Sequence, residues 1–178
     1  MNVCSLKEMI GEKIYFKPLE KTDAQKLFEY ASDKDVKKYI GWPLMNSLEE
    51  TEVFIDKLLY NEKAKTHIYA SVMSKETDEL IGTVMIFNFD YEARHAEVGY
   101  VFNKSHWGKG YCTEAVAMLD YFAFNSLKLR KLHARVTDAN IGSVKVLEKN
   151  EYEKEGLLKD YYFIDDEYYD LILYGKFL

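Results

Sequence analysis

The chain has 178 residues, of which 48% are apolar and 30% charged, and its formal net charge at pH 7 is −6. That length suits one domain, so we expect residues 1–178 to form a single unit, and no apolar run of eighteen or more residues is present to cross a bilayer. The acidic balance argues against a nucleic-acid partner, whose phosphates require basic patches, and favours a cationic one.

The first forty residues are predicted to form a strand followed by helices. Residues 13–17 alternate apolar and polar side chains and stop at Pro18, which predicts a strand. We expect a helix capped by Thr22 next, and then a short helical stretch over 36–40. The Gly41-Trp42-Pro43 break ends that stretch and turns the chain.

A longer helix and three strands are predicted to follow. Ser47 and Glu50 have the spacing of a capping box, in which the glutamate reaches back to the free amide of the serine. The apolar face of this helix is predicted to consist of Val53, Phe54, Leu58 and Leu59. Three β-rich runs come next and predict successive antiparallel strands over 67–73, 80–89 and 94–102.

The second half of the chain is predicted to alternate helices and strands. Residues 114–124 are apolar on nearly every side, which predicts a helix covered by other elements. A strand, a helix and a closing strand pair are then expected over 131–136, 141–149, 153–163 and 167–177. The order predicts an α/β (α+β) fold with a mixed, mostly antiparallel sheet of about seven strands and about four helices.

The two cysteines bear on the location of the protein. Cys4 and Cys112 are far apart and match no metal-ligand spacing, and the start of the sequence contains no apolar run typical of a signal peptide. We therefore expect a cytoplasmic protein without a metal ion or a membrane partner.

A Gly-X-Gly turn at 108–110 lies between a predicted strand and a predicted helix. The start of a helix leaves backbone N–H groups free, and its dipole favours negative charge. Gly108 and Gly110 permit positive φ and close approach of the backbone, Lys109 adds a cation, and Thr113 adds a hydroxyl. The segment therefore indicates a phosphate site, although a tight turn without a ligand is an alternative that this motif alone leaves open.

Two better-known phosphate loops do not match. The ATP-binding loop places four residues between its first glycine and a Gly-Lys-Ser/Thr, a pattern that this chain lacks. A dinucleotide-binding turn requires glycine or alanine where Thr113 stands, and an acidic residue at the end of the next strand, where Asp138 is a poor match. Neither nucleotide site is therefore expected.

Three motifs together resemble a known family: Ala96-Glu97-Val98-Gly99-Tyr100-Val101-Phe102, then Trp107-Gly108-Lys109-Gly110-Tyr111-Cys112-Thr113-Glu114-Ala115, then the segment from Asn140 to Lys149. They resemble the GNAT (Gcn5-related N-acetyltransferase) superfamily and, within it, the branch of ribosomal-protein alanine and serine N-acetyltransferases (RimJ/RimL-like). The resemblance covers nearly the whole chain. It implies an acyl-CoA N-acyltransferase fold with a sheet splayed at its centre, and acetyl-CoA-dependent transfer to a primary amine, either a protein N-terminus or a small amine.

The resemblance also implies where the cofactor binds. The glycine loop would hold the pyrophosphate of acetyl-CoA, the strand after Glu97 would pair with the pantetheine arm, and the 140–143 segment would face the thioester. The implied cofactor-binding residues are Tyr100, Val101, Phe102, Trp107, Gly108, Lys109, Gly110, Tyr111, Cys112, Thr113, Asn140 and Ser143.

Two catalytic residues are implied. Glu97 stands where several members of the superfamily carry a catalytic glutamate, and it would act as the base; a carboxylate paired on the sheet, with deprotonation through water, is the alternative. His95 shares its face, but lone histidines are usually structural. Ser143 would aid the departing thiolate, and helix capping beside Asn140 is its alternative role. Leu147 stands where many members have a tyrosine acid, which disfavours the polyamine branch.

The acceptor side has no motif of its own. Trp42 and Tyr162 are expected to line the acceptor pocket, although aromatic residues are more often plain core. A covalent route through Cys112 is disfavoured because no histidine base stands beside it. A CoA-binding sensor without turnover, or a polyamine or antibiotic acetyltransferase, is the alternative function, and the protein is expected to be a monomer or a homodimer.

Overall fold

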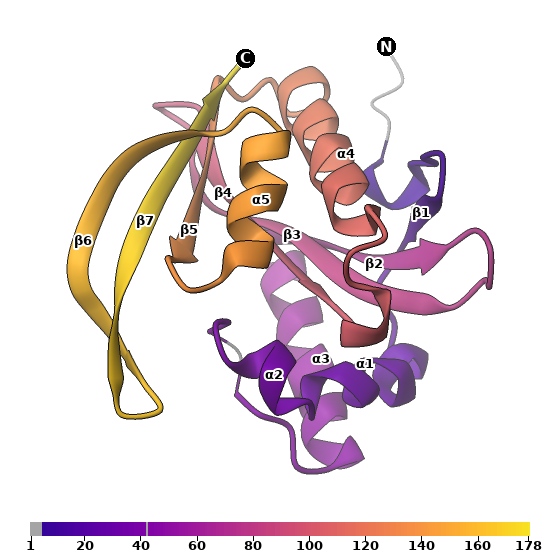
Figure 1. Cartoon of the computed structure of the whole chain (residues 1–178). Coiled ribbons are helices and arrows are strands. Elements are labelled where there is room, and N and C mark those ends of the chain that lie inside the picture. The colour runs from indigo at the N-terminus through magenta and orange to yellow at the C-terminus, as the bar shows by residue number, and fades with distance from the viewer. Residues whose placement is uncertain (1–4, 42) are drawn as a thin grey trace.

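A computed structural model describes residues 5–41 and 43–178, and it contains one seven-stranded sheet in the order β1-β2-β3-β4-β5-β7-β6 (Figure 1). The strands are β1 (Ile14–Lys17), β2 (His67–Ser74), β3 (Leu80–Asp90), β4 (His95–Phe102), β5 (Lys131–Thr137), β6 (Glu153–Ile164) and β7 (Glu167–Phe177). The α-helices are α1 (Ala24–Ala31), α2 (Lys34–Lys37), α3 (Leu48–Lys63), α4 (Tyr111–Asn125) and α5 (Ile141–Lys149). The predicted fold class is confirmed. The short helical stretch expected over 36–40 is the one-turn α2 at Lys34–Lys37, and counting it as a helix gives five where about four were expected.

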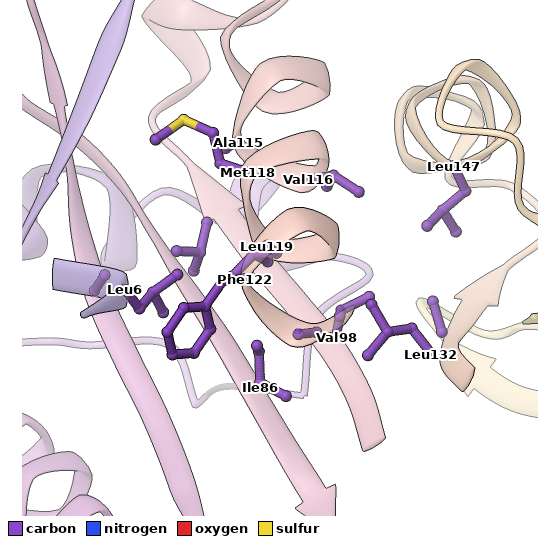
Figure 2. Close-up of a cluster of buried hydrophobic side chains, with 14 of the residues drawn as sticks. Leu6, Ile86, Val98, Ala115, Val116, Met118, Leu119, Phe122, Leu132 and Leu147 are labelled. Atoms are coloured by element: carbon purple, nitrogen blue, oxygen red, sulfur yellow. The ribbon is translucent and has the colours of Figure 1, made fainter. Parts of the chain in front are cut away.

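Each face of the sheet carries its own hydrophobic core. One core joins α4 and α5 to the sheet, and Figure 2 shows Leu119 and Phe122 of α4 lying against Ile86 and Val98 of the strands. The second core joins α1 and α3 to the opposite face, where Val101 of β4 is buried. Successive side chains of a strand point to opposite faces, so β4 contributes to both cores.

Two details of the helix starts differ from the sequence prediction. Thr22 does not cap α1, because a 3-10 turn over Lys21–Asp23 precedes the helix, and Glu20 and Asp23 form the capping box of that turn. The hydroxyl of Ser47 does accept from the Glu50 N–H at 3.2 Å, but the Glu50 carboxylate accepts from the N–H of Asn46 rather than from that of Ser47. Both helix starts are therefore capped differently from the prediction. The first is capped by Glu20 and Asp23 in place of Thr22, and in the second Asn46 takes the place of Ser47 as the donor to Glu50.

The apolar face of α3 also differs in part from the one predicted. Val53 is 69% exposed, whereas the buried positions are Thr51, Ile55 and Leu58. Phe54 and Leu59 pack partly buried against the same core. Three of the four predicted positions therefore lie on the buried side, and the pattern erred by including Val53 and by leaving out Thr51 and Ile55.

The sheet opens between β4 and β5, its only parallel pair among the described strands. The pairing covers His95 with Lys131, Ala96 with Leu132, and Glu97 with His133, and then ends. By contrast, β3 and β4 pair as far as Phe102, and β5 and β7 pair along the whole of β5. The strands past Glu97 and His133 are therefore unpaired toward each other, which confirms the expected central splay.

Candidate active site

The loop between β4 and α4 has the geometry expected of an anion site. Gly108 and Gly110 adopt φ of +75° and +86°, and Gly110 is the N-cap of α4. None of the backbone N–H groups of residues 108–113 donates to another residue within 5–41 or 43–178. Six free donors at the start of a helix form a site for an anion, and the two left-handed glycines make this turn possible.

A second lysine, which the sequence motif did not reveal, lies beside this loop. The Nζ of Lys13 is 3.5 Å from the carbonyl of Lys109, and the Lys13 backbone N–H donates to Glu114 at 3.0 Å. A groove of about 590 Å³ runs from Gly110 and Thr113 along α4 to Tyr121, and its lining includes Lys13 and Lys149. Lys13 precedes β1, so no local pattern links it to a loop almost one hundred residues later.

The backbone of β4 past Glu97 faces the opening in the sheet. The N–H of Asn103 donates to Ile81 of β3 at 2.9 Å, so in an antiparallel pair the polar groups of Phe102, Tyr100 and Val98 point away from β3. The carbonyl of Phe102 is accordingly reached from the other side by the Trp107 indole N–H at 3.0 Å. Within the described residues, the N–H and carbonyl of Tyr100 and the N–H of Phe102 therefore remain without a partner where a strand would otherwise pair.

On the α4 and α5 side, three predicted residues come together. The Asn140 side chain caps α5 by accepting the Ser143 N–H at 3.2 Å, and the Tyr100 hydroxyl approaches the Ser143 carbonyl at 3.4 Å. Burial raises the pKa of Tyr100 well above its usual range, and the nearby Cys112 thiol adds to the rise. The phenol is therefore protonated at neutral pH.

Cys112 is positioned as a packing residue rather than a nucleophile. It is a free cysteine whose side chain packs against the core under α4. Burial raises the pKa of its thiol far above neutral, so the thiolate is scarce despite the nearby helix start. This burial agrees with the low weight that the sequence gave to a covalent acyl-cysteine.

Glu97 lies on the opposite face of β4, at the last paired residue before the opening. It is 8% exposed, and its carboxylate accepts from the Asn88 amide at 2.9 Å and lies 3.7 Å from His133 Nε2. A carboxylate this buried needs such partners, because desolvation disfavours its charge. Neither Asn88 nor His133 stood out in the sequence, because both come from other strands.

Of the two aromatic residues predicted to line the acceptor pocket, the structure describes Tyr162 but not Trp42. Tyr162 is near Glu97 and Arg135: burial raises the pKa of its hydroxyl, and the Glu97 charge contributes to the rise while that of Arg135 opposes it. Trp42 lies outside the residues that the structure describes. The loop before it contacts the closing hairpin through the rings of Tyr39 and Tyr169, which meet edge to face with 6.0 Å between their centroids.

The arrangement can bring two reactants together from opposite faces of the sheet. Glu97 and Tyr100 are three residues apart on one strand, so their side chains point to opposite faces. A ligand held in the opening by the backbone of β4 would meet Glu97 on one side and the Tyr100–Ser143 pair on the other. No cluster of three His, Cys, Asp or Glu side chains suited to a metal, and no helix long and apolar enough to cross a bilayer, occurs in the described ranges.

Comparisons with known proteins show what the whole chain is similar to. Residues 13–153 match the sequence model of the Acetyltransferase (GNAT) domain family. An uncharacterized N-acetyltransferase of Bacillus licheniformis, p20, is 34% identical, and the match covers 88% of each chain. A GNAT-family acetyltransferase of Bacillus anthracis is similar in structure, with 28% identity, a TM-score of 0.82, and coverage of 94% of this chain and 96% of that one.

A ribosomal-protein acetyltransferase shares the fold as well. The RimL ribosomal L7/L12 alpha-N-protein acetyltransferase, solved with coenzyme A, has a TM-score of 0.85 and 15% identity over 96% of this chain and 97% of that one. At this identity the likeness shows the shared fold alone.

Proposed function

The chain belongs to the GNAT acetyltransferase family and is an acetyl-CoA-dependent N-acetyltransferase, and we propose that it acetylates a primary amine that reaches the Glu97 side of the opened sheet. The acceptor is a protein N-terminus or a small amine. The observation that carries this proposal is the position of Glu97, at the residue pair where the pairing of β4 and β5 ends. A buried carboxylate at that point would lie next to a thioester held in the opening.

Acetyl-CoA is proposed to bind at backbone groups that have no hydrogen-bond partner among the described residues. The six free N–H groups of residues 108–113, with Lys109 beside them, suit the pyrophosphate of acetyl-CoA. The N–H and carbonyl of Tyr100 and the N–H of Phe102, which face away from β3, suit the amides of the pantetheine arm, which would pair with β4 like an additional strand. Asn140 and Ser143 at the start of α5 would border that arm.

The proposed reaction is a direct transfer. Glu97 takes a proton from the ammonium of the acceptor, and the freed lone pair attacks the thioester carbonyl carbon. The resulting oxyanion accepts from a backbone N–H of the Tyr100 to Phe102 segment, and the carbon–sulfur bond then breaks. The leaving thiolate sulfur takes a proton from the Ser143 hydroxyl, which in turn takes the second proton that the attacking nitrogen must lose, and the products are the amide and CoA.

The experiment is release of free CoA with a panel of amines, N-terminal peptides and polyamines. We expect Glu97→Gln to lower kcat by about 10²-fold or more while leaving the Kd of CoA unchanged, and Ser143→Ala to have a smaller effect. Glu92→Gln, in the exposed turn before β4, is the matched carboxylate control. Tight acetyl-CoA binding without turnover on any amine would instead favour the sensor function.

The remaining parts of the proposal concern the setting of the enzyme. Residues 1–178 are proposed to act as one N-acetyltransferase domain, supported by a single sheet that includes strands from both ends of the chain. A cytoplasmic location is proposed because the free thiol of Cys112 fits a reducing compartment. The polyamine alternative stays disfavoured, since Leu147, where a tyrosine acid would stand, is fully buried in the core.

A further inference from the structure

An arginine lies near Glu97 on the same face of the sheet. Glu97 pairs with His133, and Arg135 stands two residues further along β5, so the side chains of Glu97 and Arg135 point to the same face. Arg135 is exposed, and it lies where the pairing of β5 with β4 has already ended. The two residues are close enough for their charges to interact. A carboxylate on β4 and a guanidinium on β5 thus stand together at the start of the opening.

The guanidinium of Arg135 forms no ion pair with a carboxylate in the part of the chain that the structure describes. Its Nη2 donates to the hydroxyl of Tyr161 at 3.0 Å, and its Cζ lies 5.6 Å from the centroid of the same ring. Lys131, at the other end of β5, is by contrast paired with Glu155 at 2.7 Å. A guanidinium carries five N–H donors, and tyrosine hydroxyls occupy only part of them. Donors therefore remain for a bound anion.

A bulge in β6 holds this guanidinium in place. The register of β6 with β7 shifts between Leu158 and Tyr162, and Asp160 within the shift adopts φ of +50°. Neighbouring residues of a regular strand point to opposite faces, whereas a bulge lets Tyr161 and Tyr162 both lie near Arg135. The two rings meet edge to face with 5.0 Å between centroids. A guanidinium already positioned by its neighbours loses less freedom when it binds an anion.

The spacing of Glu97 and Arg135 suits a small zwitterion. Arg135 stands about 6.6 Å along β5 from the residue that pairs with Glu97. An acceptor with its amine at Glu97 and a carboxylate a few bonds away at Arg135 fits this spacing, with a charge-assisted hydrogen bond of about 2.8 Å at each end. A polyamine would instead bring a second cation toward the guanidinium. Because the protein carries a net charge of −6, a zwitterion also suits it better than a purely anionic acceptor.

We propose that Arg135 determines acceptor specificity by binding a carboxylate that lies within a few bonds of the primary amine taken by Glu97. This inference rests on the proposed function, in which the acceptor reaches the Glu97 side of the sheet. Two sources share this chemistry. A free amino acid offers its α-carboxylate, and a peptide N-terminus offers the side chain of an aspartate or glutamate.

The test compares acceptors that differ only in the carboxylate. L-alanine is paired with L-alaninamide, and an Asp-Ala-Ala amide peptide with its Asn-Ala-Ala counterpart, in assays of CoA release by the full chain. We expect the wild-type kcat/KM to favour the carboxylate acceptor in at least one pair, and Arg135→Gln to lower that preference about 10- to 100-fold. Comparing the preference between variants cancels the difference in amine basicity between the two acceptors. The pair that responds identifies the source of the carboxylate.

Further variants test how the arginine acts. Arg135→Lys keeps the charge without the planar fork and should retain part of the preference, whereas Arg135→Glu should shift it toward amide acceptors and polyamines. Tyr161→Phe removes the hydroxyl that positions the guanidinium and should lower the preference less than Arg135→Gln does. Arg130→Gln is the matched control, because this arginine lies just before β5 and stacks over the ring of Phe177 at 5.3 Å. The control should leave the preference unchanged.

The outcomes separate this inference from the proposed function. Wild-type turnover of amines without a preference for either carboxylate acceptor would overturn the inference and leave acetyl transfer standing. The same holds if Arg135→Gln slows carboxylate and amide acceptors alike, which is the result expected of an arginine that only supports Glu97 or the fold. If no amine of any kind raises CoA release, the proposed function and this inference fail together. Melting temperature and CoA Kd, measured on every variant, show that the variants are folded.

Discussion

Replacing Gly110 tests whether the loop before α4 binds the pyrophosphate of acetyl-CoA through its backbone N–H groups. Gly110 adopts φ of +86°, and a Cβ placed there would find only Lys13 Nζ, at 3.7 Å. Gly110→Ala therefore introduces no clash, and its cost is that of placing an L-residue in the left-handed region, about 1–2 kcal/mol. For a domain of this size, that cost lowers the melting temperature by about 2–8 °C.

The same substitution should weaken CoA binding. The part of this strain that the free loop escapes by relaxing out of the left-handed conformation must be supplied on binding instead of lowering the melting temperature, and the full cost of about 1–2 kcal/mol would correspond to a Kd about 5- to 30-fold higher. Gly110→Asn is the matched variant, because asparagine tolerates this conformation better and should lose less of both stability and affinity. Gly110→Leu should abolish binding by blocking the anion from the amides. Calorimetry and thermal melts measure both quantities, and wild-type values for alanine and leucine would refute the assignment of the loop.

Two further predictions concern buried ionisable groups. Burial raises the pKa of Asp120 above its ordinary 3.8, while Lys176, at 2.8 Å, opposes the rise. The folded state therefore binds more protons, so this site costs stability as the pH rises through the raised pKa. Lys176→Met should cost about 3–5 kcal/mol at pH 7 and less near pH 4 in denaturant titrations, and equal losses at both pH values would contradict this. In a Cys4→Ser background, Cys112 should react slowly with iodoacetamide at neutral pH, because burial raises the pKa of its thiol. Labelling should be slower still when CoA is present. Rapid labelling, or labelling that CoA does not slow, would count against the proposed position of CoA beside Cys112.

The sequence predicted the elements well because each has a strong local signal. The alternation of β2 to β4, the apolar α4 and the glycine turn are all read from neighbouring residues, and each strand lies within one or two residues of its expected range. The helix caps were less accurate. Glu20 and Asp23 compete with Thr22 for the same free amides, and only the observed 3-10 turn decides between them.

The candidate site could be predicted only where it is local. The glycine loop and Glu97 were found from motifs that each lie within one segment. Lys13, Asn88 and His133 were missed because they reach the site from other elements, through the pairing of β3, β4 and β5 and the packing of the N-terminal segment. Such neighbours leave no periodic or spaced signal in a single sequence.

The short pairing of β4 with β5 makes this the most weakly hydrogen-bonded line in the sheet, called the seam below. Only three residue pairs join the first four strands to the last three along the sheet, so the two halves should open more readily at this line than within either half. A cofactor arm lying in the gap would close the seam and fasten the halves together. Acetyl-CoA at one hundred times its Kd would add about 2.7 kcal/mol to the free energy of unfolding. The cofactor would then act as a folding partner of the enzyme, and the lifetime of the folded chain in a cell would follow the supply of acetyl-CoA.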